Sequence, residues 1–342
     1  MDTEKNIPRR SMLYDDELYG KVEIMEPVLL DLITSDAMKR TEGISQHGIT
    51  ALLGITPSFS RFDHAVGAML LVRRLGANLK EQVAALLHDV SHTAFSHVID
   101  FVFDDHRGQS YHEEKKEEFV ANTDIPSILN QHGMDWRELI REERFPLLEQ
   151  PSPDLCADRL DYFLRDVEFL KLANRDEIGE VIDSLEVVEG RIAVNDYSVA
   201  CWLAYTFIEA DRVSWSSFRE VGLYQLTAEA IKAASRYGVI VEADLWGSDE
   251  SLWGKLKSAD HPEVKRWVKL ITPGTRFIWN EEAPVFTIST KVRSIDPPVT
   301  NGNSVTPLSE LDPAFARYRN EYLSGKQGQW SMGIVNAPEV MS

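Results

Sequence analysis

The chain has 342 residues, of which 43% are hydrophobic, and its formal net charge is −19. This length allows one large domain or two ordinary ones, and the hydrophobic content excludes global disorder. The acidic balance argues against a nucleic-acid-binding surface, because phosphate backbones are bound through clustered lysines and arginines.

The N-terminal stretch 1–19 carries charges throughout and lacks the apolar core of a signal peptide. No segment approaches the run of about 20 apolar residues that a membrane helix needs. The two cysteines, Cys156 and Cys201, are too few for a disulfide framework or a cysteine-rich zinc site. We therefore expect no membrane partner and a cytoplasmic protein, with the nucleus as the alternative if the source is eukaryotic.

Helical periodicity dominates the first two thirds of the chain. Gly76 is a natural C-terminal stop for one of these helices, and Asn78 followed by Glu81 resembles a capping box that opens the next. The pattern predicts helices over 26–33, 62–75, 79–90, 155–172, 202–236 and 263–271, with a last one over 312–323.

Strand signals are confined to a few short segments. A β-hairpin is predicted near 185–194, turning at Gly190, and strands are predicted over 276–279 and 285–292. The tail beyond Gly325 is expected to be loose. The predicted fold class is therefore mainly α, with a helical domain over 1–272 and a small β-containing C-terminal appendage over 273–342 packed on it.

Histidines are concentrated in one part of the sequence, since seven of the nine lie between His47 and His112. The apolar run 83–87 delivers the adjacent His88 and Asp89 at the end of a predicted buried helix. Burying two ionisable groups there is costly unless they are paired or bind a metal ion. His64 lies at the start of an upstream helix, in the stretch Arg61-Phe62-Asp63-His64.

A third polar motif lies on the helix predicted over 155–172. The side chains fall at i, i+3, i+4, i+7 and i+8, which places Asp158, Asp161, Tyr162, Arg165 and Asp166 on one stripe. Taken alone, this stripe has two interpretations, a solvated salt-bridged face or part of a functional site.

The three motifs together resemble the HD superfamily of metal-dependent phosphohydrolases. They are Arg-Phe-Asp-His, then Leu-His-Asp-Val-Ser-His-Thr-Ala-Phe-Ser-His, then Asp-Arg-Leu-Asp-Tyr-Phe-Leu-Arg-Asp, in this order along the chain. Within the superfamily they look most like the deoxynucleoside triphosphate triphosphohydrolases, including the bacterial dGTPases. In that branch, 39–48 is similar to a helix that contacts substrate, and 291–298 resembles a strand near the C-terminus. The resemblance implies an HD-domain helical bundle.

The resemblance also implies one metal ion held by His64, His88, Asp89 and Asp158. Two imidazoles and two carboxylates form a mixed nitrogen and oxygen site, which suits Mn, Fe, Zn, Co or Ni and, with weaker preference, Mg. The implied function is hydrolysis of a nucleotide phosphate ester, a small-molecule substrate, with cleavage of a dNTP to deoxynucleoside and triphosphate as the branch's form of the reaction. A homo-oligomer is common in this branch.

Further residue roles follow from the same resemblance. His92 is the expected general acid, oriented by Asp100 and assisted by His112, and His88 and His92 share a face if their helix continues. Arg61 and Arg159 are expected to hold phosphate oxygens. Contacts with the sugar or base are assigned to Gln46, Tyr162 and Asp166.

The sequence departs from the triphosphohydrolases in 214–229. Most positions that are basic in that branch hold Ser, Glu, Leu or Thr here, unless Arg212 or Arg219 compensates. Without such cations a triphosphate binds poorly, so a nucleoside monophosphate or phosphodiester is an alternative substrate. Two more hypotheses are compatible with the motifs, a di-iron HD-type oxygenase with His92 or His112 as an added ligand, and a non-catalytic nucleotide sensor.

Overall fold

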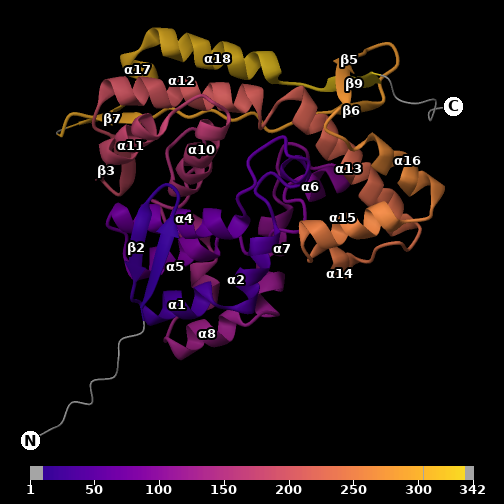
Figure 1. Ribbon diagram of the computed structural model, residues 1–342. Helices are drawn as coiled ribbons and strands as arrows, with labels where there is room; N and C mark the ends of the chain where they lie inside the picture. Colours follow the sequence, from indigo (N-terminus) through magenta and orange to yellow (C-terminus); the bar gives the residue numbers. More distant parts are fainter. Residues whose placement is uncertain (1–10, 303, 336–342) are drawn as a thin grey trace, which may run out of the picture.

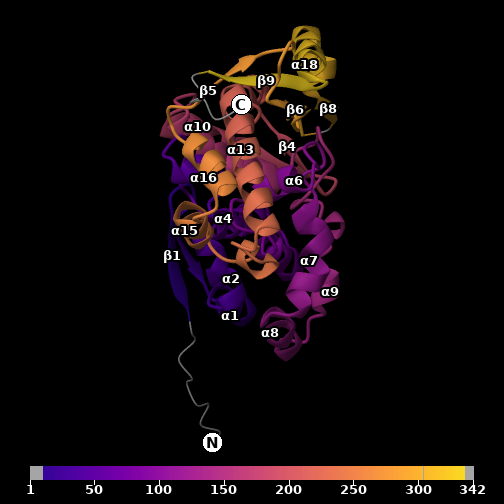
Figure 2. The ribbon, with the colours of Figure 1, turned by 90° about the vertical axis from the view of Figure 1, so that its right-hand side faces the viewer.

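The computed structural model describes residues 11–302 and 304–335. The chain is mainly helical, as the sequence predicts, with small sheets near both ends (Figures 1 and 2). Within the described residues, every helix is too short or too polar to cross a membrane. The longer helices are α1 (Pro27–Ile33), α4 (Arg61–Arg74), α5 (Leu79–Leu87), α7 (Tyr111–Ala121), α8 (Ile125–Gln131), α10 (Ala157–Phe169), α11 (Arg175–Ser184), α12 (Tyr197–Val213), α13 (Phe218–Arg236), α15 (Asp249–Ser258), α16 (Pro262–Leu270) and α18 (Pro313–Lys326).

Short helices and strands complete the described fold. The short helices are α2 (Asp36–Arg40), α3 (Ile49–Leu52), α6 (Val98–Val102), α9 (Trp136–Leu139), α14 (Glu242–Leu245) and α17 (Leu308–Leu311), with 3₁₀ turns η1 (Thr41–Gly43) and η2 (Glu142–Arg144). The strands are β1 (Met12–Asp16), β2 (Gly20–Ile24), β3 (Leu185–Val188), β4 (Arg191–Val194), β5 (Arg276–Trp279), β6 (Phe286–Ile288), β7 (Pro298–Thr300), β8 (Val305–Pro307) and β9 (Trp330–Val335).

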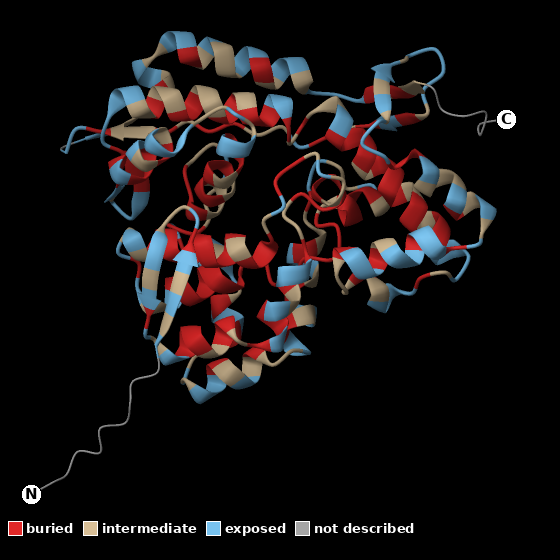
Figure 3. Cartoon of the chain, viewed as in Figure 1, coloured by how far each residue is buried: buried red, intermediate tan, exposed pale blue. Residues whose placement is uncertain are grey.

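Helix α4 packs against both α5 and α10 in the largest hydrophobic core of the molecule (Figure 3). Their contact faces are apolar side chains at helical spacing, and Leu71, Leu86 and Leu164 are fully buried. Ser60 caps α4 through a capping box with Asp63, so the first turn of this helix is fixed. This packing brings the start of α4, the end of α5 and the start of α10 together.

The N-terminal hairpin of β1 and β2 is an element that the charge-rich sequence did not indicate. It is antiparallel, with Met12 opposite Ile24 and Asp16 opposite Gly20. Asp16 stabilises the turn, because its carboxylate accepts hydrogen bonds from the backbone of Leu18 and Tyr19 at 2.8 and 3.1 Å. The same turn contacts α10, as described below.

The hairpin predicted near 185–194 is present as β3 and β4, and Gly190 at its turn has a φ of +78°. It belongs to a four-stranded sheet in which β4 pairs in parallel with β7 and β7 pairs with β8. The predicted strand 285–292 was too long, because β6 ends at Ile288 and the following segment has no strand partner until Pro298.

The expectation of a loose tail beyond Gly325 was wrong for 330–335. These residues form β9, the central strand between β5 and β6, in which the side chains of Trp330 and Met332 are buried. Residues 336–342 lie outside the described part of the chain. Helix α18 packs along α12, and β5 packs on α13, so the C-terminal elements cover the side of the bundle next to the site described below (Figure 1).

Candidate metal centre and active site

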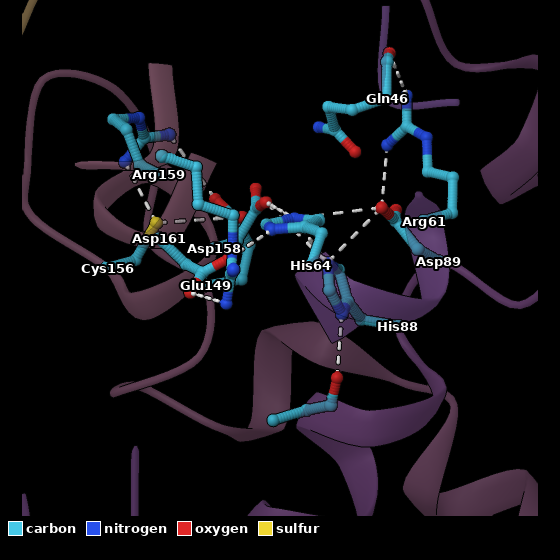
Figure 4. Close-up of polar contacts among 12 residues, drawn as sticks. Gln46, Arg61, His64, His88, Asp89, Glu149, Cys156, Asp158, Arg159 and Asp161 are labelled. Carbon is cyan, nitrogen blue, oxygen red and sulfur yellow. Dashed lines mark hydrogen bonds and ion pairs between the residues drawn. The ribbon is translucent and has the colours of Figure 1, made fainter. Parts of the chain in front are cut away.

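Four donor atoms from three distant parts of the chain converge on one point (Figure 4). His64 Nε2 lies 3.2 Å from His88 Nε2 and 2.9 Å from Asp158 Oδ1. Asp89 Oδ2 lies 3.7 Å from His64 Nε2 and 3.6 Å from His88 Nε2. Donor atoms that each sit about 2.0–2.2 Å from one ion are separated from one another by roughly 3.0–3.4 Å. The ligand atoms of His64, His88 and Asp89 all lie within 4.8 Å of one another, and Asp158 Oδ1 lies 2.9 and 3.6 Å from the two imidazole Nε2 atoms, so the cluster is compact enough for one metal ion with a small adjustment of the side chains.

Hydrogen bonds on the far side of both imidazole rings turn their Nε2 atoms towards this point. His64 Nδ1 lies 2.7 Å from Asp161 Oδ2, and His88 Nδ1 lies 2.7 Å from the carbonyl oxygen of Ala85. Since each Nδ1–H donates to an oxygen, each Nε2 presents a lone pair, which is the tautomer that a metal ion requires. The residues present thus fit a divalent ion, in donor type and in orientation.

The polar stripe on α10 is buried, so its interpretation as a solvated face was wrong. Asp161 and Asp166 have no exposed surface, and Asp161 is bound by Arg165 Nε at 2.8 Å and by the hydroxyl of Tyr19 at 3.0 Å. Sequence analysis placed Asp161 on this stripe without assigning it a role. Its spacing one turn after Asp158 was the available signal.

Gly67 leaves space for the side chains of Asp161 and Arg165 behind His64. Gly67 lies on α4, one turn after His64, and a methyl group at its position would stand 2.2 Å from Asp161 Oδ1 and 2.1 Å from Arg165 Nη2. Only a residue without a side chain leaves room at this position for the paired Asp161 and Arg165 side chains. This space is what lets Asp161 reach the ring of His64.

The charges of the cluster stabilise one another. Burial alone would lower the pKa of His88, but Asp89 and Asp158 outweigh this effect and raise the pKa to about 10. Burial alone would raise the pKa of Asp89, but the charges of Arg61 and His88 hold it well below its usual range. The carboxylates are therefore ionised at neutral pH, and without the ion His88 holds an additional proton that a metal ion would displace.

A second group of histidines stands beside the metal centre. His92 and His112 stack with ring centroids 3.8 Å apart, and His92 Nε2 lies 3.2 Å from Asp89 Oδ1. Burial, followed by the charge of Arg61, lowers the pKa of His92 to about 3. Among the described residues, Nδ1 of His92 has no hydrogen-bond partner, and the contact of Nε2 with Asp89 lacks hydrogen-bond geometry. Buried polar atoms are rarely left unpaired, which indicates that a ligand completes this part of the site.

Two expectations about His92 need correction. Helix α5 ends at Leu87, so His88 and His92 are not on one continuous helical face, and His92 reaches the site through the turn that follows. Asp100 does not orient His92 by a hydrogen bond. Its carboxylate pairs with Nδ1 of His97 at 3.0 Å and accepts from the backbone of Tyr111 at 3.1 Å.

The two arginines assigned to phosphate already have protein partners. Arg61 donates to Asp89 at 2.6 Å and to Ser96 at 3.0 Å. Arg159 donates to the carbonyl oxygens of Asp154 and Gln150, to the sulfur of Cys156 and to Glu149. Both line the pocket in front of the metal centre, but the expected role as free phosphate donors is not supported, because most of their N–H groups are used.

The residues expected to contact sugar or base all line the same pocket. Gln46 and His47 reach it from the loop after η1, and not from a helix as the resemblance implied. Both carboxylate oxygens of Asp166 are engaged, one by His47 Nε2 at 2.8 Å and one by Trp215 Nε1 at 2.6 Å. Asp166 therefore fixes the pocket wall, while the side-chain oxygen of Gln46 has no partner among the described residues.

Several residues of the pocket wall had no role predicted from the sequence, namely His47, Trp215, Glu220 and Lys291 with Arg293. Neither Arg212 nor Arg219 compensates for the cations absent from 214–229. Arg212 pairs with Glu209 at 2.7 Å, and Arg219 donates to the carbonyl oxygen of Pro273, so both point elsewhere. Tyr162 packs edge-to-face against Trp215 with centroids 5.0 Å apart.

Comparisons with known proteins agree with this site. The model of the HD domain matches residues 61–166, a range that contains the four donor residues. The metal-dependent phosphohydrolase cns2 of Cordyceps militaris is 38% identical over 333 residues, which span 94% of this chain and 95% of that protein. The deoxynucleoside triphosphate triphosphohydrolase SAMHD1 homolog of Dictyostelium discoideum is 21% identical over 318 residues, spanning 79% of this chain and 59% of that protein.

A solved structure shows the same fold. A hypothetical protein from Aquifex aeolicus superposes with a TM-score of 0.70 at 20% sequence identity, covering 93% of this chain and 99% of that one. The two chains thus share an overall fold over nearly their whole length.

Proposed function

The chain belongs to the HD-domain family of metal-dependent phosphohydrolases, and we propose that it hydrolyses the phosphate ester of a nucleotide that carries one phosphate group. The observation behind this proposal is the set of charges that line the pocket. Six carboxylates, on Asp89, Glu113, Glu149, Asp158, Asp166 and Glu220, face four cations, on Arg61, Arg159, Lys291 and Arg293.

One bound divalent ion brings these formal charges into balance. Burial, together with the charge of Asp158, raises the pKa of Glu149 to about 8, so this side chain is mostly protonated at neutral pH. With Glu149 neutral, the pocket loaded with the ion has a formal net charge of about +1, which suits a ligand of low negative charge such as a phosphate monoester. A triphosphate carries about four negative charges, and its repulsion by the remaining carboxylates is strong where the dielectric is low.

The aromatic side chains of the pocket support a nucleotide as the substrate. Tyr162, Trp215 and Tyr224 line the pocket, and aromatic faces of this kind accept a planar base. Gln46 offers an unpaired amide oxygen to a hydroxyl or amino group of the ligand.

The ion held by His64, His88, Asp89 and Asp158 supplies Lewis-acid chemistry when bound, since it polarises a phosphoryl oxygen and activates water as a nucleophile. The protein must then provide a proton for the leaving oxygen. We assign this proton to His92, stacked on His112, because both rings face the pocket and a phosphate dianion nearby would raise their depressed pKa values. Such an acid contributes about 10²–10⁴-fold to the rate.

The distant triphosphohydrolase relative makes release of triphosphate the second candidate. One experiment distinguishes monophosphate hydrolysis from triphosphate release. The Mn²⁺-loaded protein is incubated with nucleoside mono-, di- and triphosphates and with cyclic nucleotides, and the products are identified by anion-exchange chromatography. We expect orthophosphate from monophosphates. Triphosphate released from a dNTP would contradict the proposal, and nucleotide binding without any product would support a sensor.

A two-iron oxygenase would need a second metal site. Ligand atoms of Asp89, His92 and His112 lie within 4.8 Å of one another and would have to hold the second ion. Counting metal ions per chain by elemental analysis separates the hypotheses, since our proposal requires one ion and no oxygen consumption. A homo-oligomer remains a prediction that light scattering during gel filtration would test.

A further inference from the structure

The segment 289–297 runs past the mouth of the pocket without forming part of a sheet. It is held by contacts on both sides. The carbonyl oxygen of Ser294 accepts from Ser152 at 3.2 Å, and the hydroxyl of Ser294 accepts from Arg319 of α18 at 3.1 Å. Ile295 is fully buried, and the backbone of Asp296 donates to Pro153 at 2.9 Å. The segment is therefore fixed, and it carries Lys291 and Arg293 to the pocket.

Lys291 and Arg293 are the two pocket cations that have no acidic side-chain oxygen within ion-pair distance among the described residues. Arg61 and Arg159 each lie within 4.0 Å of a carboxylate, Asp89 and Glu149 respectively. Lys291 and Arg293 form no ion pair within 4.0 Å in the described part of the chain, although the protein as a whole carries a net charge of −19.

The arrangement is costly without an anion. Burial and the neighbouring charge of Arg293 lower the pKa of Lys291, although this side chain remains accessible to solvent. The charges of Glu113 and Asp158 act on Lys291 in the opposite direction, but neither forms an ion pair with it, so the repulsion between the two cations is only partly offset. An anion that binds both would relieve this repulsion, and the N–H groups of a lysine and an arginine match phosphate oxygens.

We propose that Lys291 and Arg293 form a phosphate clamp. The clamp binds those oxygens of the substrate phosphate that do not coordinate the metal ion. The clamp rests on the proposed function in one respect only, that the substrate carries a phosphate group. It replaces the cations that 214–229 lacks, and it comes from the C-terminal elements. The occupant is a phosphate monoester, or inorganic phosphate as its product.

Gln109 holds one arm of the clamp in position. Its side-chain oxygen accepts from Arg293 Nη2 at 2.6 Å, and Gln109 is 5% exposed. This residue lies in the turn before α7, the helix that carries His112. The contact leaves the other N–H groups of the guanidinium available, apart from a long contact of Nη1 with the carbonyl oxygen of Lys291 at 3.4 Å.

Titration calorimetry of inorganic phosphate into the Mn²⁺-loaded protein tests the clamp without any assumption about the base. We expect Lys291→Gln and Arg293→Gln each to weaken phosphate binding, and the double variant to weaken it about 10- to 100-fold, with bound metal unchanged. Lys291→Arg should bind phosphate nearly as well as the unmodified protein. Arg317→Gln, which removes an exposed arginine of α18 outside the pocket, is the matched control and should have no effect.

The phosphate-binding experiment tests the clamp independently of the proposed nucleotide substrate. Equal phosphate affinity in the double variant and the unmodified protein would overturn the clamp, whatever nucleotide is hydrolysed. So would a failure of the unmodified protein to bind phosphate at millimolar concentration. A clear loss of phosphate binding in the double variant would support the clamp even if no nucleotide of the panel were a substrate. With a substrate in hand, the clamp requires a higher KM in both single variants and no change in Arg317→Gln.

Discussion

His64 Nδ1 lies 2.7 Å from Asp161 Oδ2, and both side chains are completely buried. This hydrogen bond joins α4 to α10 directly behind the metal centre. Asp161 fixes the ring of His64 in the tautomer whose Nε2 faces the other three donors. Arg165 and Tyr19 bind the same carboxylate, so the N-terminal hairpin also contributes to the position of a metal ligand.

Replacing Asp161 with Asn should weaken the metal site without removing a ligand. The amide cannot balance the charge of Arg165 or accept as strongly from His64, and loss of such a supporting group typically costs about 10- to 100-fold in metal affinity. Metal affinity measured by competition with a chelator checks this. Asp183→Asn, which removes an exposed carboxylate paired with Arg74, is the control, and equal affinity in the two variants would contradict the role of Asp161.

Gly67→Ala should disturb the same contact from the other helix. The added methyl group would stand 2.2 Å from Asp161 Oδ1 and 2.1 Å from Arg165 Nη2, so these two side chains must leave their positions behind His64. We expect a loss of about 1–3 kcal/mol in the free energy of unfolding together with weaker metal binding. Gly179→Ala in α11 adds a methyl group into open space and should stabilise the protein by about 0.5–1 kcal/mol. Denaturant titration measures the free energy of unfolding of both variants. Unchanged stability and metal affinity in Gly67→Ala would contradict the close packing at this position.

His92→Ala should slow hydrolysis without changing metal binding. His92 does not belong to the four-donor cluster, so bound metal should be unchanged, whereas turnover should fall by about 10²–10⁴-fold. Elemental analysis and initial rates on the same preparation provide both readouts. His132→Ala, which removes a histidine far from the pocket that pairs with Asp31, should leave both unchanged. Full turnover by His92→Ala would show that His92 is not the general acid and would assign that role to His112.

The pH dependence of the metal-free protein follows from His88. Its folded-state pKa is raised to about 10, whereas its unfolded value is near 6.5. The stabilisation from protonated His88 is therefore fully present below about pH 6.5 and is lost as pH rises towards 10. We expect the free energy of unfolding of chelator-treated protein to fall between pH 6.5 and 9.5, with a smaller fall in His88→Gln. Metal affinity should rise over the same range, because fewer protons must be displaced.

The sequence predicted most of the helices and, through the family resemblance, four side chains that the structure brings together, but it did not predict what supports them. His64, His88, Asp89 and Asp158 lie in local motifs, and apolar periodicity placed them at the ends of helices. Asp161 appeared as one charge among several on a stripe, because nothing in the spacing shows that α4 carries a glycine opposite it. That relationship depends on how two helices pack, which is a property of the tertiary structure.

The phosphate contacts were predicted poorly for a similar reason. Arg61 and Arg159 stand next to the motifs, and the sequence does not reveal that Asp89 and Glu149 already bind them. Lys291 and Arg293 are more than 120 residues away from Asp158 along the chain, and nothing local to them indicates a pocket. The N-terminal hairpin and β9 were missed because their strands are short and partly exposed, so they lack a clear alternation of apolar residues.

The most direct test of the central claim is to remove and restore the metal ion while following orthophosphate release from the best nucleotide of the panel. The protein is stripped with a chelator, its metal content is measured, and Mn²⁺ is then added in steps. We predict no turnover by the stripped protein, and a rise in rate that stops at one ion per chain. Undiminished orthophosphate release by protein shown to be free of metal would contradict the account.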